Sequence, residues 1–229
     1  MNVQAVILAA GMGTRLGKPW PKPLTPLRDG RTIMQQQLDN LTAVFDDLRV
    51  TTVVGFKLEM ILEQFPDVTY VYNENYDRTN TNRSLLKALR TSPSGGVLWL
   101  NGDVVFDAEV LRRAQRLISA DESFICVNTA AVGDEEVKYT VDEDGRVALL
   151  SKTVVGAKGE AVGINFVAAR DKAALIERLA ECDDMDYFER GVELMIEKDG
   201  VHVLPLDITD LFAVEVDFED DLTRANAHL

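Results

Sequence analysis

Short apolar strands alternate with amphipathic helices along the first half of this chain, and this alternation constrains the fold more than any other feature. Several of the strands are apolar almost throughout, as expected for strands buried on both faces. The pattern is typical of an α/β protein with a Rossmann-like, mostly parallel sheet sandwiched by helices, in which ligands bind beyond the carboxyl ends of the strands. The predicted strands are Val3–Leu8, Arg49–Val54, Val68–Tyr72, Val97–Leu100 and Ser123–Val127, and the predicted helices are Ile33–Val44, Leu58–Phe65, Asn82–Arg90 and Ala108–Ser119.

The pattern changes in the second half. Val137–Val141 and Arg146–Ser151 flank an acidic turn that contains Gly145, and they are predicted to form a β-hairpin. Because no Pro-, Gly- or Ser-rich linker interrupts the chain, we expect one core domain with a small hairpin-containing insertion on the substrate side. The remaining predicted elements are strands at Glu160–Ala168, Val201–Pro205 and Phe212–Val216, and helices at Asp171–Ala180, Tyr187–Lys198 and Glu219–His228.

The composition excludes several classes of function. Lysine and arginine number 24 against 38 aspartates and glutamates, which gives a net charge of −14. Such a surface repels nucleic acids and anionic membranes, so neither is an expected partner. No segment approaches the ~18 apolar residues of a membrane span, and the N-terminal strand lacks a basic leader. With only Cys126 and Cys182, the sequence is typical of a reduced, cytoplasmic protein.

A glycine-rich loop follows the first strand and carries two cations. Gly11 and Gly13 allow backbone N–H groups to approach phosphates closely. Arg15 offers a bidentate fork for phosphate oxygens, and Lys22, held between two prolines, offers a compact charge. The loop therefore predicts a site for a phosphate-bearing ligand.

The glycine spacing excludes the two most common phosphate-binding motifs. A P-loop would have a glycine at Met12 and a serine or threonine at Pro19. The dinucleotide fingerprint would place its third glycine at Leu16. A nicotinamide-dependent oxidoreductase is therefore not expected.

The run Leu8-Ala9-Ala10-Gly11-Met12-Gly13-Thr14-Arg15-Leu16, followed by Pro21-Lys22-Pro23-Leu24, resembles the signature of nucleotidyltransferases that activate sugar phosphates and small alcohol phosphates. The resemblance implies the nucleotide-diphospho-sugar transferase fold, an NTP substrate, Mg²⁺, and catalytic roles for Arg15 and Lys22 on the triphosphate. It further implies one domain over residues 1–229, with an NTP-binding half at 1–133 and an acceptor-binding half at 134–229. The residues that it implies around the nucleotide are Leu8, Ala9, Ala10, Gly11 and Gly13.

Two aspartates are candidates for binding Mg²⁺. Asp103 follows a buried apolar strand and a glycine, where a carboxylate can hold a metal at the sheet rim or cap a turn. The family has a Gly-Asp motif at this place and a second metal-binding aspartate near its end, which implies Asp217 here. Glu215 is the weaker candidate, because a regular strand would direct it to the opposite face.

The polar segment before the third predicted helix separates subgroups of the family. Tyr72-Asn73-Glu74-Asn75-Tyr76, followed by Asn82-Arg83-Ser84-Leu85, looks like the cytidylyltransferases that act on phosphocholine and related small phosphates. This likeness implies that Asn80, Asn82 and Ser84 contact the nucleotide. The same residue types also form polar loops and cap helices, and that alternative stays open.

The second half resembles the same subgroup and implies the acceptor site. Lys152 is expected to hold the acceptor phosphate as a catalytic residue, and Lys138 is the reserve candidate. Asp186 and Tyr187 belong to an aromatic and acidic patch that suits a cationic or polyol head group. Relatives of this kind often have tryptophan where this chain has Phe212-Ala213-Val214, which leaves the head group open.

The sequence therefore predicts a Mg²⁺-dependent nucleotidyltransferase that transfers CMP from CTP to a small phosphorylated or phosphonate acceptor such as phosphocholine, with release of pyrophosphate. The alternative enzyme is a sugar-1-phosphate nucleotidyltransferase that uses UTP, GTP or dTTP. A catalytically silent nucleotide-binding subunit is a third possibility, and the retention of both cations and both aspartates argues against it. The expected partners are the NTP and the acceptor, and a homodimer is left open.

Overall fold

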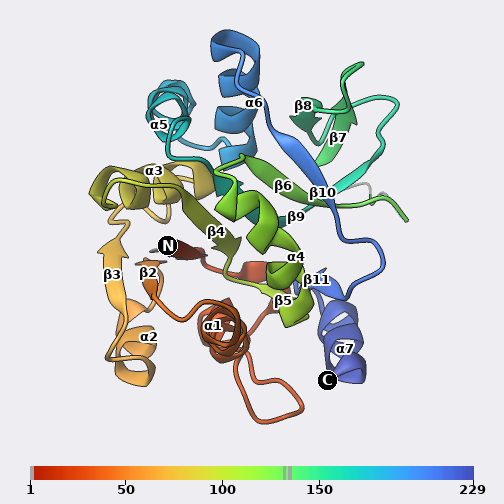
Figure 1. Cartoon of the computed structure of the whole chain (residues 1–229). Coiled ribbons are helices and arrows are strands. Elements are labelled where there is room, and N and C mark those ends of the chain that lie inside the picture. Colours follow the sequence, from red (N-terminus) through yellow and green to blue (C-terminus); the bar gives the residue numbers. More distant parts are fainter. Residues whose placement is uncertain (1–2, 131–132, 134–135) are drawn as a thin grey trace.

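The computed structural model describes residues 3–130, 133 and 136–229. Its centre is a nine-stranded sheet in which the order β10-β6-β9-β4-β1-β2-β3 is extended by β7 and β8 beside β9 (Figure 1). The strands are β1 (Val3–Ala9), β2 (Leu48–Val54), β3 (Thr69–Tyr72), β4 (Val97–Asn101), β6 (Phe124–Asn128), β7 (Lys138–Val141), β8 (Val147–Ser151), β9 (Gly159–Val167) and β10 (Leu204–Asp207).

Along the path from β10 to β3, four of the six strand pairs run parallel, as the apolar pattern predicts. β1 pairs in parallel with β2 and β4, β2 pairs in parallel with β3, and β6 pairs in parallel with β10. β9 is the exception, because it runs antiparallel between β4 and β6. The predicted hairpin is also present as β7 and β8, which pair antiparallel with each other.

Helices cover both faces of the sheet, and β1 shows how its side chains divide between them. Ile7 joins an apolar cluster that includes residues of α1, α2 and α4, whereas Val6 and Leu8 join a cluster with residues of α3, α5 and α6. This alternation is what a strand buried on both faces requires, and Figure 1 shows α3, α5 and α6 on one side and α1 and α2 on the other. The helices are α1 (Ile33–Val44), α2 (Leu58–Gln64), α3 (Thr81–Thr91), α4 (Ala108–Ser119), α5 (Lys172–Glu181), α6 (Phe188–Asp199) and α7 (Glu219–His228).

Local sequence signals explain several helix ends. The Thr32 hydroxyl accepts a hydrogen bond from the Gln35 N–H at 3.2 Å and caps α1. Gly200 ends α6 with a φ of 64°, a conformation that favours glycine. After it, residues 201–203 run to the sheet edge, where Leu204 pairs with Phe124. β10 therefore begins later than the predicted start at Val201.

Two short strands form a separate antiparallel sheet. β5 (Val104–Phe106) was not predicted, and it pairs with β11 (Ala213–Glu215), for which Phe212–Val216 was predicted. This pairing carries the C-terminal segment to the end of β4, and α7 begins shortly after it. The small sheet is the element that completes the site described below.

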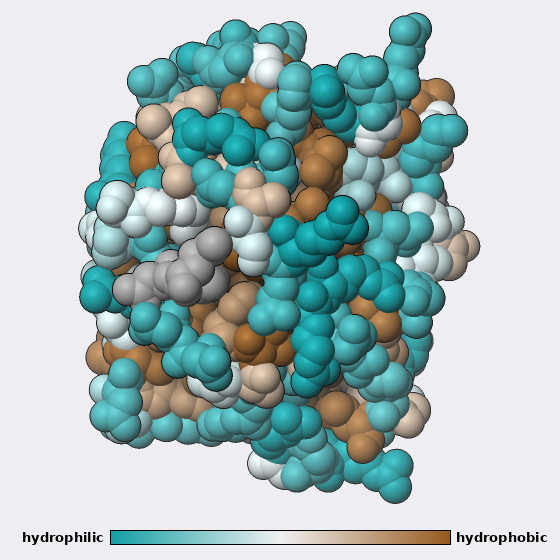
Figure 2. Space-filling model, viewed as in Figure 1, coloured by the Kyte–Doolittle hydropathy of each residue, from teal (hydrophilic) through white to brown (hydrophobic). Residues whose placement is uncertain are grey.

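The surface is mostly hydrophilic in the view of Figure 2, with scattered hydrophobic patches, in keeping with the high content of charged residues. Within residues 3–130, 133 and 136–229, no helix is long and apolar enough to cross a membrane. Cys126 and Cys182 are both buried free thiols. The division into an NTP-binding half and an acceptor-binding half stays a prediction, and residue 134, where the second half would begin, lies outside the described residues.

Candidate active site

The glycine-rich loop and the Asp103 loop leave neighbouring strands at the same rim of the sheet. Leu8 of β1 lies opposite Asn101 of β4 in the parallel ladder. The Gly102 N–H donates to the Leu8 carbonyl at 3.0 Å. A side chain at Gly102 would place its Cβ 2.6 Å from that carbonyl oxygen, so this close approach needs a glycine. Both loops therefore share one rim of the sheet.

Two short 3₁₀ turns hold the cations of the first loop. Arg15 lies in the turn Thr14–Leu16, which Gly13 precedes with a φ of 59°. Lys22 begins the turn Lys22–Leu24 directly after Pro21. A Cβ built on Gly13 would lie 3.2 Å from the Lys22 Cβ and Cγ, so the glycine leaves room for the aliphatic part of Lys22. The loop thereby places both cations at the same rim of the sheet.

The antiparallel pairing of β5 with β11 brings the second aspartate to the first. Glu215 lies opposite Val104, and beyond this pair the Val216 N–H donates to the Asp103 carbonyl at 2.9 Å. The next residue, Asp217, reaches the same place as the Asp103 side chain. The two predicted metal ligands therefore meet at the carboxyl end of β4.

Lys22 joins the two aspartates directly. Its Nζ donates to Asp103 Oδ2 at 2.8 Å and also to Asp217 Oδ1. Arg15 Nη1 donates to the other oxygen of Asp217 at 2.8 Å. The four residues predicted to act on the triphosphate and the metal thus form one connected network.

The network is partly buried, and this shapes its charges. Burial lowers the pKa of Lys22, but the charges and hydrogen bonds of Asp103 and Asp217 outweigh it, so the pKa of Lys22 is raised overall. Burial likewise raises the pKa of Asp217, and the hydrogen bond and charge of Lys22 together with Arg15 lower it overall. The site therefore holds charged cations and a charged carboxylate at neutral pH.

A cavity of 240 Å³ extends from this network to two of the residues that were predicted to bind the acceptor. It joins the loop cations and aspartates with Lys152 and Tyr187, which come from the second half of the chain. Three glutamates, Glu136, Glu189 and Glu215, also line it. The polar and loop residues of its lining are Gly11, Arg15, Thr81, Asn101, Gly102, Asp103, Glu136, Lys152, Tyr187, Glu189, Glu215 and Asp217.

Glu215, which the sequence ranks below Asp217 as a metal ligand, lines the same cavity, and its rank as a ligand stays a prediction. The expectation that it faces away from Asp217 assumed a regular strand, but β11 ends at Glu215 and both side chains line the cavity. Asn101 Nδ2 donates to Glu215 Oε1 at 3.1 Å. Burial, and then the neighbouring charge of Asp103, raise the pKa of Glu215 well above its ordinary value.

Glu189 is a buried carboxylate without a full set of partners. It is 7% exposed, and in the described part of the chain its Oε2 accepts no hydrogen bond. Burial raises its pKa from 4.5 to about 7. A buried carboxyl oxygen without a hydrogen-bond partner is costly, so its presence in the cavity wall points to a ligand group that can donate to it.

Lys152 lines the same cavity as Arg15, Asp103 and Asp217, and its contact with the acceptor stays a prediction. Its Nζ is 4.8 Å from the centre of the Tyr187 ring, a cation–π contact. Lys138 Nζ donates to the Lys152 carbonyl at 3.4 Å. Asp186 does not line the cavity; instead its carboxylate accepts from the Asp183 N–H at 2.9 Å.

Most of the predicted nucleotide residues of the first loop line a second cavity of 170 Å³, which shares Leu8, Gly11, Gly102 and Asp103 with the first. Ala10 is buried, and its carbonyl accepts from the Phe56 N–H at 3.0 Å. The second cavity is lined by Leu8, Ala9, Gly11, Gly13, Lys22, Pro23, Gly102 and Asp103.

Asn80, Asn82 and Ser84 have structural partners and line neither cavity. Asn80 caps α3 by accepting from the Thr81 N–H at 2.8 Å. Asn82 is buried and donates to the Asp183 carbonyl at 2.6 Å. Ser84 is buried and accepts from Asn73 at 3.1 Å. These contacts match the alternative that the sequence left open for this segment, and a nucleotide contact by these side chains stays a prediction.

The donor set fits a magnesium ion that shares its ligands with a substrate. Within the described residues, no group of three or more His, Cys, Asp or Glu side chains is arranged to hold a metal. Mg²⁺, however, is commonly bound by one or two carboxylates together with substrate phosphates and waters. Asp103 and Asp217 both reach Lys22 Nζ, and so they offer two carboxylates around one point.

Solved structures share this fold over the full chain. A CTP:phosphocholine cytidylyltransferase from Streptococcus pneumoniae has a TM-score of 0.79 at 18% identity and covers 100% of this chain and 99% of its own. An inositol-1-phosphate CTP transferase from T. maritima has a TM-score of 0.75 at 16% identity and covers 96% of this chain and 92% of its own. At these identities the likeness establishes the fold, the nucleotide-diphospho-sugar transferase type that the sequence predicted.

Curated relatives match parts of the chain more closely. A CMP-5'-(3-aminopropyl)phosphonate synthase from Streptomyces rubellomurinus is 40% identical over 130 residues, which span 53% of this chain but only 20% of that protein. A D-glycero-alpha-D-manno-heptose 1-phosphate guanylyltransferase from Aneurinibacillus thermoaerophilus is 23% identical over 99% of this chain and 98% of its own length. The model of the MobA-like NTP transferase domain matches residues 5–192. Since this match covers most of the chain, the protein belongs to the MobA-like NTP transferase family of nucleotidyltransferases.

Proposed function

We propose that the chain transfers CMP from CTP to a small acceptor that carries a phosphate or phosphonate group, with release of pyrophosphate. The observation that carries this proposal is the single cavity lined both by Arg15, Asp103 and Asp217 and by Lys152 and Tyr187. A cavity that joins a nucleotide-binding group of residues to a second cation can hold two phosphate-bearing substrates side by side. Proximity of this kind is a large part of catalysis in phosphoryl-type transfers.

In the proposed reaction, an oxygen of the acceptor phosphate or phosphonate attacks the α-phosphorus of CTP. The new P–O bond forms as the bond from the α-phosphorus to the pyrophosphate oxygen breaks, and pyrophosphate leaves with that electron pair. The attacking oxygen is already anionic, so no general base is required. Lys22 and Arg15 stabilise the charge that moves onto pyrophosphate, and Lys152 positions the acceptor.

Asp103 and Asp217 are the residues that would hold Mg²⁺, which when bound neutralises charge on the reacting phosphates. In the structure the Lys22 ammonium group donates hydrogen bonds to both carboxylates. Triphosphate oxygens offer Lys22 and Arg15 new partners, and the aspartates are then released for other ligands. The acidic surface of the chain is compatible with this site, because the loop N–H groups and three basic side chains supply the local positive field.

The cavity also favours an acceptor that carries an ammonium group. The buried Glu189, whose Oε2 accepts no hydrogen bond in the described part of the chain, and the half-buried Glu136 line it together with the Tyr187 ring. Carboxylates and an aromatic face are the groups that bind alkylammonium ions. The names of two similar proteins, a CMP-aminopropylphosphonate synthase and a phosphocholine cytidylyltransferase, support the same acceptor class.

The second candidate function is a sugar-1-phosphate nucleotidyltransferase that uses UTP, GTP or dTTP. It is favoured by the heptose 1-phosphate guanylyltransferase that aligns along almost the whole chain. Glu189 and Glu136 in the cavity wall favour the cytidylyltransferase with an ammonium-bearing acceptor, since a neutral sugar has no cation to pair with them.

A matrix assay separates these candidates. Pyrophosphate release is measured for CTP, UTP, GTP and dTTP, each with phosphocholine, 2-aminoethylphosphonate, inositol phosphate and glucose-1-phosphate, with and without MgCl₂. The proposal expects turnover with CTP and an amino- or ammonium-bearing acceptor, dependent on MgCl₂. Turnover with another NTP and a sugar phosphate would replace it by the second candidate, and no release under any condition would favour a silent nucleotide-binding subunit.

A further inference from the structure

A second cleft lies along one face of α3, away from the candidate active site. Its volume is 440 Å³, and it shares no lining residue with either active-site cavity. Arg83, Lys87 and Arg90 of α3 line it at helical spacing, and Arg78 faces them from the preceding loop. Asp184 is the single acidic side chain in the lining. In a chain with a net charge of −14, a concave surface with four cations is unusual.

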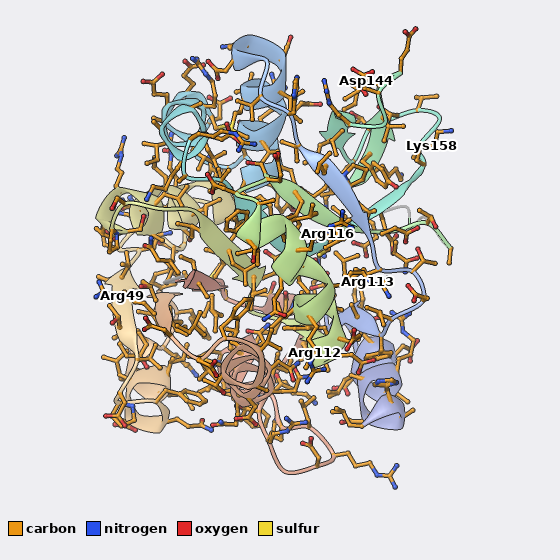
Figure 3. The ribbon with its side chains drawn as sticks, in the orientation of Figure 1. Arg49, Arg112, Arg113, Arg116, Asp144 and Lys158 are labelled. Carbon is orange, nitrogen blue, oxygen red and sulfur yellow. The ribbon has the colours of Figure 1, made fainter. Side chains whose placement is uncertain are left out.

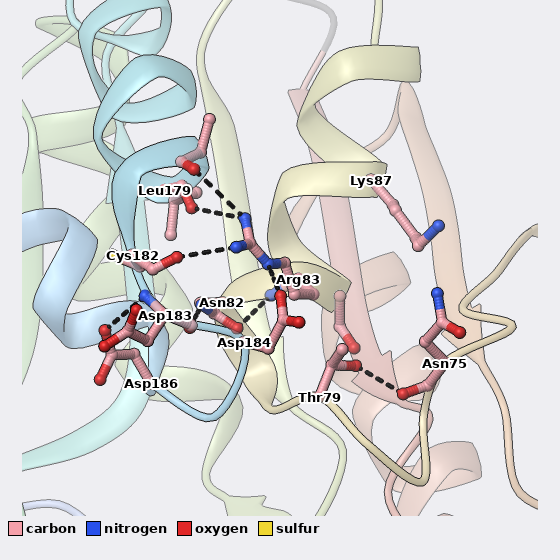
Figure 4. A network of polar contacts seen from close by, with 12 residues as sticks. Asn75, Thr79, Asn82, Arg83, Lys87, Leu179, Cys182, Asp183, Asp184 and Asp186 are labelled. Atoms are coloured by element: carbon pink, nitrogen blue, oxygen red, sulfur yellow. Dashed lines mark hydrogen bonds and ion pairs between the residues drawn. The ribbon is translucent and has the colours of Figure 1, made fainter.

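Two of these cations are engaged in holding the fold together. Figure 4 shows Arg83 against the segment that follows α5. Its Nε lies 2.8 Å from Asp184 Oδ1, and its Nη2 donates to the Cys182 carbonyl at 2.7 Å. Lys87 pairs with Glu74 at 2.7 Å. These two side chains form one wall of the cleft and are already oriented.

The side chains of Arg78, Arg90 and Asn75, which also line the cleft, have hydrogen-bond donors that the fold does not use. Arg90 is exposed, and within the described residues it makes no side-chain hydrogen bond or ion pair. The side chain of Arg78 is 82% exposed, and its contact with Asp77, at 3.7 Å, is longer than a hydrogen bond. The Asn75 side-chain amide is also exposed and has no hydrogen-bond partner in the described part of the chain. The fold does not use these groups.

We infer that this cleft binds a small phosphate-bearing anion between Arg78 and Arg90. Two guanidinium groups provide the forked donors that match phosphate oxygens, and the Asn75 amide adds a further donor at the same cleft. The cleft is surrounded by the acidic residues Glu74, Asp77 and Asp184 and by an acidic surface. This negative charge repels a polynucleotide or an anionic membrane, which would extend beyond the cleft, and so it favours a small ligand. The chemical class is therefore an inorganic phosphate, a pyrophosphate or a nucleotide.

The test is isothermal titration calorimetry of the full chain with inorganic pyrophosphate. Pyrophosphate is also a product of the proposed reaction, so the Lys22→Ala variant is used to weaken the active site. In that background we expect one remaining site. The double variant Arg78→Ala/Arg90→Ala is expected to weaken this site by at least about tenfold, as the loss of charge-assisted hydrogen bonds predicts.

A matched double variant controls for the change in net charge. Arg112 and Arg116 are exposed arginines of α4, seen in Figure 3, and Arg112→Ala/Arg116→Ala is expected to leave pyrophosphate affinity unchanged. Thermal unfolding confirms that each variant is folded. Parallel titrations with inorganic phosphate and with CTP show which member of the class binds most tightly.

The inference is overturned if the Arg78→Ala/Arg90→Ala change weakens binding by less than tenfold, or if the α4 control weakens it equally. It is also overturned if Lys22→Ala alone removes all pyrophosphate binding. The inference does not rest on the proposed function. If Lys22 has no part in phosphate binding, its substitution changes nothing, and the arginine variants still decide whether the cleft is a site.

Discussion

The ammonium group of Lys22 lies 2.8 Å from the carboxylate of Asp103. The same nitrogen also donates to Asp217, which the pairing of β5 with β11 brings from the far end of the chain. Two carboxylates around one point repel each other unless a cation separates them. Lys22 supplies that cation in the structure, and this arrangement underlies the first two predictions.

Replacing Lys22 by alanine is expected to lower the rate of pyrophosphate release by roughly 10²–10³-fold, the usual effect of removing one preorganised charge-stabilising group. The side chain is only 11% exposed, but it is held by polar contacts at a rim and not by the apolar core, so the variant should fold. Steady-state release of pyrophosphate and circular dichroism measure the two effects.

Lys18→Ala is the matched control for this experiment. Lys18 lies in the same loop and pairs with Glu219, outside the Lys22 network. Its substitution should change the rate by less than about threefold, because exposed ion pairs contribute little. Near-normal pyrophosphate release by a folded Lys22→Ala protein would remove Lys22 from the proposed mechanism.

Replacing Asp103 by asparagine is expected to abolish the response of activity to MgCl₂. The amide keeps the shape of the side chain but removes the charge that a hard divalent cation prefers. Titration of activity with MgCl₂ measures the effect. Asp107→Asn is the control, since Asp107 follows β5 in the same region and contacts His228 at 2.8 Å. An unchanged magnesium dependence in Asp103→Asn would exclude this carboxylate from the metal site.

The sequence predicted one half of this site better than the other. The glycine loop and Asp103 follow buried parallel strands, and the carboxyl ends of such strands share one rim, so periodicity and topology were sufficient to bring them together. The position of Asp217 at that rim came from a family resemblance. Its physical cause is the ladder between Val104 and Glu215, which is three residues long on each side and leaves almost no periodic signal.

The glutamates of the cavity could not be ranked from the sequence. Glu189 lies in the first turn of an amphipathic helix, where an acidic residue is ordinarily exposed and favoured by the helix dipole. In the fold α6 packs against α5, β8 and α3, and Glu189 is buried there. Asn80 and Asn82 were predicted to contact the nucleotide, but a polar segment before a helix predicts a helix cap and a binding site equally well. In the structure both side chains have partners within the fold.

Replacing Lys152 by alanine is expected to raise the KM for the acceptor by at least about tenfold while changing the KM for the NTP little. The reason is that Lys152 contacts Tyr187 in the part of the cavity assigned to the acceptor and not the glycine loop. Initial rates over both substrate concentrations measure the two constants. Lys158→Ala, at the lysine labelled in Figure 3, should leave both unchanged. An equal rise in both KM values would contradict the assignment.

The buried Glu189 predicts a distinct dependence of stability on pH. Its pKa is raised from 4.5 to about 7, because burial disfavours the charged form. Between these values the folded state binds more protons at this group than the unfolded state does, so its contribution to the free energy of unfolding falls as pH rises from about 4.5 to 7 and then stays constant. For a shift of this size the loss is on the order of 3 kcal/mol.

Glu189→Gln removes this titration while keeping the shape of the side chain. Relative to wild type, the variant should gain stability as pH rises from 4.5 to 7, with a difference in Tm that grows by roughly 5–10 °C over this range. Thermal unfolding at several pH values measures the difference. Glu197→Gln on the exposed side of the same helix should run parallel to wild type at every pH. Parallel curves for Glu189→Gln as well would show that Glu189 titrates normally, and the case for an ammonium-bearing acceptor would lose its main support.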